Sequence, residues 1–135
     1  ERFAEVEKLA SEYAKKYGFS FAKFSQTHKF DAKVNLLDTL GELVNVYAIS
    51  DIVVLGGSFV PNIGGHNPIE CAQFNPVIII GEFIFNQKAL FSLVENIYIA
   101  KVSEIGSIMD GDAKKSKIAV QASADAIIED IRSTL

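Results

Sequence analysis

The sequence has little of several features that define common classes of protein. It has one cysteine, Cys71, so no disulfide framework can form within the chain. It has no basic excess, because 13 Lys and Arg stand against 17 Asp and Glu, a net charge of −4. The basic stripe typical of nucleic-acid binders and the basic cluster that holds a membrane surface are both missing. No apolar run approaches the roughly 18 residues that a membrane-spanning helix requires.

What the sequence does have is enough apolar content for a folded core. Hydrophobic residues fill 49% of its 135 positions and charged residues 22%, which excludes an intrinsically disordered chain. A chain of this length buries roughly 68% of its unfolded surface on folding. We therefore expect one domain, spanning residues 1–135, with its own core.

Helical patterns alternate with short apolar runs along the chain. Helices are predicted over residues 3–17, 40–50, 67–74, 103–109 and 114–135, and one capped by Asn86. Strands are predicted over 19–24, 34–37, 52–55, 77–80 and 97–102, with 52–55 and 77–80 buried on both faces and a loop over 25–31. The alternation predicts an α/β fold, a Rossmann-like open parallel sheet with helices on both faces.

Three segments directly follow predicted strands. They are Thr39–Glu42, Gly56–Glu70 and Gly81–Asn86. In an open parallel sheet the ligand binds in the crevice at the carboxyl ends of the strands. We therefore expect these segments to line one edge of the sheet.

The second segment carries the clearest pattern. Two glycine pairs are followed by Asn67-Pro68-Ile69-Glu70, in which Asn is a favoured helix cap and Pro a favoured first residue. Glycines let the backbone approach a ligand, and the free N–H groups of a helix start suit a phosphate. From the residues alone, Glu70 either accepts hydrogen bonds from ribose hydroxyls or only completes the cap. The spacing matches neither the dinucleotide nor the P-loop fingerprint.

The first segment leaves a similar choice open. Thr39 and Glu42 have the spacing of a capping box. Gly41 would then lie in the first helical turn, where it costs about 1 kcal/mol relative to Ala. Either a ligand pressed against the helix start explains this glycine, or the segment only caps the helix.

Few residues are candidates for chemistry. His66 could be a general base, a phosphate ligand or a residue that orients its loop. His28, His66 and Cys71 lack the spacing of metal ligands, and Cys71 is interpreted as a small apolar filler. We expect no metal site.

Taken together, these segments resemble the carboxyl-terminal half of 3-deoxy-D-manno-octulosonic acid (Kdo) transferases. The resemblance covers residues 1–102 and is carried, in order and spacing, by Asp38–Leu43, Tyr47–Asp51, Gly56–Ser58, Gly64–Glu70 and Phe85-Asn86.

The resemblance implies a glycosyltransferase with two Rossmann-like domains that face a cleft, the GT-B arrangement. Such enzymes transfer Kdo from CMP-Kdo to the lipid A precursor of lipopolysaccharide, on the cytoplasmic side of the bacterial inner membrane. This chain would be the carboxyl-terminal, donor-binding domain without its first strand. The acceptor site, membrane anchor and catalytic base would lie in an amino-terminal domain. We therefore expect this chain to have no catalytic residue, cofactor, nucleic-acid partner, direct membrane contact or transferase activity of its own.

The resemblance also implies which residues contact the donor. Nine are expected to do so: Leu40, Gly41 and Glu42 against the nucleotide, Ser58, Gly64, Gly65, His66 and Asn67 near the phosphate and sugar, and Glu70 on the ribose hydroxyls. Glu82-Phe83 stands where the family often has Pro-His. Because a carboxylate disfavours an anionic donor, we exclude Glu82 from the site.

Two other functions remain open at this stage. One is a GT-B transferase domain that uses a different nucleotide sugar. The other is a non-catalytic nucleotide-binding module, favoured by the absence of a convincing base, nucleophile or metal set.

Overall fold

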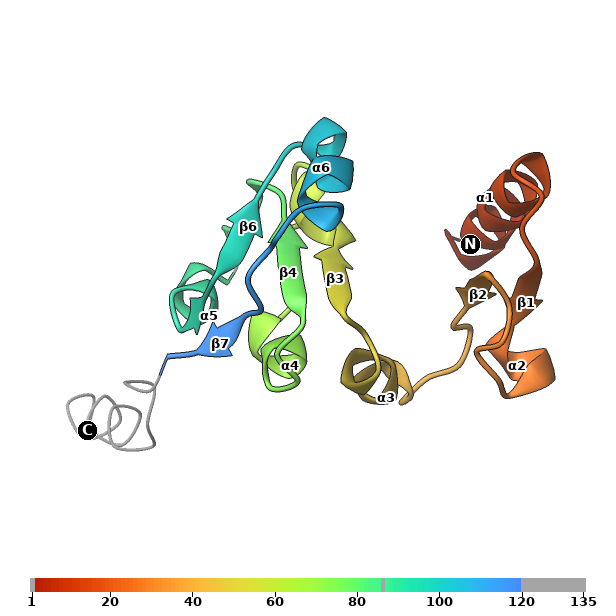
Figure 1. Ribbon diagram of the computed structural model, residues 1–135, viewed down its shortest axis with the longest axis horizontal. Helices are drawn as coiled ribbons and strands as arrows, with labels where there is room; N and C mark the ends of the chain where they lie inside the picture. The colour runs from red at the N-terminus through yellow and green to blue at the C-terminus, as the bar shows by residue number, and fades with distance from the viewer. Residues whose placement is uncertain (1, 86, 120–135) are drawn as a thin grey trace. The chain divides into compact units, whose positions relative to one another are not determined.

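The computed structural model describes residues 2–85 and 87–119, in which helices and strands alternate (Figure 1). The chain forms two compact units, Glu1–Leu43 and Val44–Leu135, and each is described here by itself. Within the described residues, no helix combines the length and apolar character needed to cross a membrane.

The first unit contains two helices and a pair of strands. They are α1 (Arg2–Lys16), β1 (Phe21–Lys23), α2 (Phe24–Thr27) and β2 (Val34–Leu36), with β1 and β2 parallel. Gly18 follows α1 with a φ of +69°, the left-handed conformation expected after a helix end. The prediction of a loop over 25–31 is wrong at its start, because α2 occupies it and ends at His28, whose φ is 51°.

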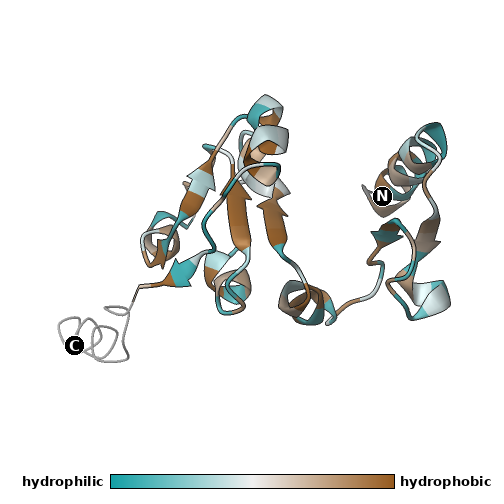
Figure 2. Ribbon diagram, in the orientation of Figure 1, coloured by the Kyte–Doolittle hydropathy of each residue, from teal (hydrophilic) through white to brown (hydrophobic). Residues whose placement is uncertain are grey.

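The second unit is built on a parallel sheet in the order β3-β4-β6. Its strands are β3 (Ile52–Leu55), β4 (Val77–Ile80) and β6 (Ile97–Ile99). All four residues of β4 are buried, and Figure 2 shows β3 and β4 in the brown of apolar residues. Alternate residues of a strand face opposite sides of the sheet, so β4 contributes to two core clusters.

Helices cover both faces of this sheet, as predicted. On one face, Ile78 and Ile80 pack with residues of α3 (Leu43–Ala48), α4 (Pro68–Ala72) and α5 (Lys88–Phe91). On the other face, Val77 and Ile79 pack with residues of α6 (Ile105–Met109). The sheet therefore sits between two helical layers, which leaves the ends of its strands for a ligand site.

The strands differ from the predictions in three respects. The first and second units have separate parallel sheets, where one continuous sheet was predicted. β3 lies at the edge of its sheet and Val54 is 41% exposed, so this strand is not buried on both faces. β6 ends at Ile99, and the 3-10 helix η2 (Val102–Glu104) follows.

Three predicted helices also change. The helix predicted over 40–50 begins at Leu43. The cap of α5 is Gln87, and Asn86 itself lies outside the described residues. The helix predicted over 114–135 is wrong at its start, because β7 (Lys117–Ile118) pairs antiparallel with β5 (Val94–Glu95), extended by a hydrogen bond from the N–H of Ala119 to the carbonyl of Leu93 at 2.9 Å. Residues 120–135 of that prediction lie outside the described part.

Candidate functional site

Two of the three predicted edge segments meet at the carboxyl ends of β3 and β4. Beyond β3, the chain forms the 3-10 helix η1 (Gly56–Phe59), which contains Ser58. The Ser58 hydroxyl donates to the carbonyl of Leu55 at 2.6 Å and accepts from the N–H of Gly81 at 2.8 Å. The carbonyl of Ser58 also accepts from the N–H of Phe83 at 2.9 Å. Ser58 therefore joins the segments that follow β3 and β4.

The burial of Ser58 changes the role expected for it. Its side chain is 0% exposed, and its hydroxyl is fully engaged by main-chain groups. We assign it the positioning of the loop around the site, not a direct contact with a ligand.

The glycines of the site are explained by contacts within the protein. A Cβ atom on Gly57 would lie 2.5 Å from the carbonyl oxygen of Gly64, and one on Gly81 would lie 2.3 Å from that of Ser58. A Cβ atom on Gly65 would lie 2.9 Å from the ring of Phe91. Gly64 has a φ of +80°, a conformation that favours glycine. The close backbone approach predicted for these glycines is therefore an approach to neighbouring segments of the chain.

The start of α4 is capped as predicted. The Asn67 side-chain oxygen accepts from the N–H of Ile69 at 3.0 Å, and its side-chain nitrogen lies 3.5 Å from a carboxylate oxygen of Glu70. His66 and Glu70 are exposed, and Asn67 is half-buried. α4 has only five residues, so its dipole is weak. Pro68 has no N–H and the N–H of Ile69 is bound by Asn67, so an anion here would depend mainly on the exposed side chains.

The remaining predicted segment, Thr39–Glu42, lies in the first unit. The predicted capping box is wrong: among the described residues, the Thr39 hydroxyl is shielded from solvent and has no hydrogen-bond partner, and α3 begins only at Leu43. Gly41 has a φ of +85°, so a left-handed turn before the helix explains this glycine. Leu40 is 100% exposed and offers an apolar surface to a ligand.

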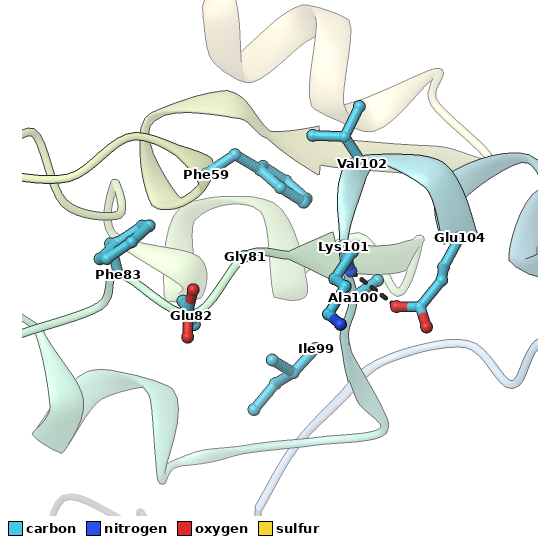
Figure 3. A pocket seen from close by; sticks show the side chains of 9 residues that line it. All are labelled: Phe59, Gly81, Glu82, Phe83, Ile99, Ala100, Lys101, Val102 and Glu104. Atoms are coloured by element: carbon cyan, nitrogen blue, oxygen red, sulfur yellow. Dashed lines mark hydrogen bonds between the residues drawn. The ribbon is translucent and has the colours of Figure 1, made fainter.

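A pocket of about 380 Å³ lies at the carboxyl ends of β4 and β6 (Figure 3). Its lining is mainly apolar and consists of Phe59, Gly81, Glu82, Phe83, Ile99, Ala100, Lys101, Val102 and Glu104. The carboxylate of Glu104 accepts from the main-chain N–H of Lys101 at 2.7 Å. Glu82, which was expected to lie outside the site, therefore lines this pocket.

Phe59, Gly81, Glu82 and Phe83 lie in two of the predicted edge segments. The rest of the lining lies at the end of β6 and after it, where no glycine pair or motif marks Lys101 or Val102. Their position after a strand is the one sequence feature that could have identified them, because ligand crevices form where parallel strands end.

The described residues do not suggest a metal centre or a reactive nucleophile. Within them, no group of three or more His, Cys, Asp or Glu side chains could hold a metal ion. Cys71 is 0% exposed, its thiol donates to the carbonyl of Pro68 at 3.3 Å, and burial raises its pKa to about 11. Because the thiolate is the reactive form, this cysteine is an apolar filler of the core.

Comparisons with known proteins were made by family, by sequence and by structure. No family model matches the chain. It is 35% identical, over 104 residues, to a 3-deoxy-D-manno-octulosonic acid transferase of Haemophilus influenzae, covering 76% of this chain and 24% of that protein. It is 37% identical, over 89 residues, to the protein of the same name from Chlamydia trachomatis, covering 63% of this chain and 20% of that protein.

A solved structure is similar over a comparable stretch. It is the C-terminal CMP-Kdo binding domain of WaaA from Acinetobacter baumannii, with a TM-score of 0.65 and 26% identity. The match covers 79% of this chain and 56% of that one. The resemblance to Kdo transferases and the α/β fold class are therefore confirmed. The chain spans about a quarter or less of the length of these two curated relatives.

Proposed function

We propose that this chain is the donor-binding part of a Kdo transferase and binds the CMP portion of CMP-Kdo. The observation that carries the proposal is the structural similarity, at a TM-score of 0.65, to a domain named for CMP-Kdo binding. The joined loops at the carboxyl ends of β3 and β4 support it, because this is where ligands of such sheets bind.

The proposed contacts are those that the resemblance to Kdo transferases implies. Gly64–Asn67 provides main-chain and side-chain groups for phosphate and sugar, and the exposed Glu70 accepts from the ribose hydroxyls. Ser58 fixes the loop that precedes them. Leu40–Glu42 packs against the nucleotide, with the exposed Leu40 supplying the apolar contact.

We further propose a division of labour in the whole protein. Residues 1–135 act as the donor-binding domain of a GT-B enzyme. A second domain then carries the base and the site for the lipid A precursor, at the cytoplasmic side of the bacterial inner membrane. On this proposal the chain binds the donor nucleotide and transfers no Kdo by itself.

A titration of the isotope-labelled chain with CMP tests nucleotide binding. We expect amide shifts at Gly41, Gly65 and Glu70 at millimolar CMP, with no shift at Gly106, which lies in α6. No response from a folded chain would contradict the proposal. Stronger binding of UMP, UDP or GDP would favour another nucleotide-sugar transferase.

A transfer assay tests the division of labour. The chain is incubated with CMP-Kdo and a lipid A precursor, and we expect no product. Measurable Kdo transfer would contradict the placement of the catalytic base outside these residues.

A further inference from the structure

Asp38 lies two residues after the end of β2 and is bound to the start of α2. Its carboxylate accepts from the N–H of Ser25 at 2.7 Å and from the Ser25 hydroxyl at 2.5 Å. The residue at the cap position of α2, Lys23, makes no side-chain cap bond. Asp38 therefore satisfies a free N–H group of this helix from 13 residues away along the chain.

A lysine extends the connection to a third element. The ammonium group of Lys23 lies 3.0 Å from a carboxylate oxygen of Glu7 on α1 and 3.7 Å from one of Asp38. The Asp38 side chain is only 7% exposed. α1, β1 and the end of β2 are thus linked by charged groups around one carboxylate.

The chain leaves this cluster directly into the segment proposed to contact the nucleotide. Thr39–Glu42 starts at the next residue and has no regular secondary structure before α3 begins at Leu43. The anchored Asp38 fixes the start of this segment, and Gly41 within it takes a left-handed conformation that turns the chain. A free aspartate would let the segment sample many directions, and binding would then require ordering it.

We propose that Asp38 is a positioning residue for a nucleoside monophosphate: through Ser25 it holds Thr39–Glu42 in the orientation that contacts the nucleotide. The proposal rests on the proposed function, because it assumes that this segment touches the ligand. Asp38 itself acts through the main chain and makes no ligand contact.

The test measures CMP affinity of the complete 135-residue chain by amide shifts. Asp38→Asn and Ser25→Ala are each expected to weaken affinity about tenfold, the size typical for loss of a charge-assisted hydrogen bond. Ser25→Thr keeps the hydroxyl and is expected to retain affinity within about twofold. Asp31→Asn, at an exposed carboxylate of the same unit, is the matched control and should also stay within about twofold.

A second readout needs no ligand. Asp38→Asn and Ser25→Ala are expected to lower the NMR order parameters of the Leu40 and Gly41 amides, while those in the centre of α1 stay unchanged. The α1 amides also report whether a variant has lost its fold, and Ser25→Ala is the milder change if Asp38→Asn does.

The outcomes separate this proposal from the proposed function. If the unchanged chain binds CMP and both variants bind it equally well, the positioning role is overturned and the proposed function stands. If no form of the chain binds CMP, the proposed function fails, and the order parameters alone decide whether Asp38 positions the segment. Unaltered order parameters in both variants would overturn this role, and lower values confined to the segment would support it.

Discussion

Ser58 and Gly81 are joined by a hydrogen bond from the main-chain N–H of Gly81 to the Ser58 hydroxyl, 2.8 Å long and completely buried. The same hydroxyl donates to the carbonyl of Leu55, the last residue of β3. One side chain thereby fixes the exits of two neighbouring strands. The two ends are 23 residues apart in sequence, so this contact determines how the loops of the candidate site lie against each other.

Replacing Ser58 should weaken the fold of the second unit. Ser58→Ala leaves the buried N–H of Gly81 without its acceptor, so we expect the free energy of unfolding to fall by about 1–3 kcal/mol. Urea unfolding measures the change. Ser107→Ala is the matched control: its hydroxyl donates to the carbonyl of Glu104 but is exposed, and it should change stability by at most about 0.5 kcal/mol. Equal effects of the two variants would contradict the structural role of Ser58.

A methyl group at position 81 should be tolerated far less than one at position 106. In Gly81→Ala the new Cβ would lie 2.3 Å from the carbonyl oxygen of Ser58, so the backbone must shift, and we expect a loss of about 3 kcal/mol or more. Gly106→Ala meets nothing within 4 Å inside α6 and should stabilise by up to about 1 kcal/mol. Thermal or urea unfolding compares the two. A mild effect at position 81 would show that the loops are not in contact.

The first unit should lose stability in acid through Asp38. Its hydrogen bond from the Ser25 hydroxyl is the largest cause that holds the pKa of this carboxyl below its ordinary value of 3.8. A depressed pKa contributes stability above the unfolded-state value, and this contribution is lost as the pH falls through the folded-state value. We therefore expect Asp38→Asn to flatten the loss of stability below about pH 4, measured by urea unfolding followed on amides of β1 and β2.

Lys23 in the same cluster contributes stability that is lost at high pH. Its hydrogen bond to Glu7 is the largest cause that raises its pKa above 10.5. That contribution is present below the unfolded-state pKa and is lost as the pH rises through the folded-state value. The difference in stability between the unchanged chain and Asp38→Asn should therefore be full near neutral pH and disappear in acid, while in alkali only the part that comes from Lys23 is lost. If the unchanged chain and Asp38→Asn lose the same stability below about pH 4, the assignment of this loss to Asp38 is contradicted.

Glu70 should discriminate between ribose and deoxyribose. If its carboxylate accepts from ribose hydroxyls, the chain binds CMP more tightly than 2′-deoxy-CMP, and Glu70→Gln reduces that preference by about 3–10-fold. Glu95→Gln, an exposed carboxylate of the same unit, is the control. The free energy of unfolding should be almost unchanged because Glu70 is exposed. A preference that survives Glu70→Gln would leave this residue only the role of a helix cap.

The parts of the structure that sequence predicted well are those set by local chemistry. Asn67 and Pro68 determine the start of α4 through their own cap geometry, and the apolar run of β4 is buried as predicted. The resemblance to Kdo transferases followed from the same local motifs.

The parts that sequence did not predict depend on distant contacts. The cap spacing of Thr39 and Glu42 did not show that Gly41 takes a left-handed turn and delays α3. The two-residue strand β7 exists only through its pairing with β5, more than 20 residues earlier. Likewise, Asp38 belongs to a motif, but its partner Ser25 is marked by no pattern. The eight residues other than Ser58 that are expected to contact the donor remain predictions.

The glycines that meet neighbouring backbone and side-chain atoms also limit how this edge can vary among proteins or be redesigned. Because no methyl group fits at Gly57, Gly65 or Gly81, these positions must stay glycine if the backbone is to keep its course there. Altered ligand preference must then come from substitutions at exposed positions around it, such as His66, Glu70 and Glu82. A library that keeps the three glycines and varies those three side chains would explore new specificities while preserving the fold.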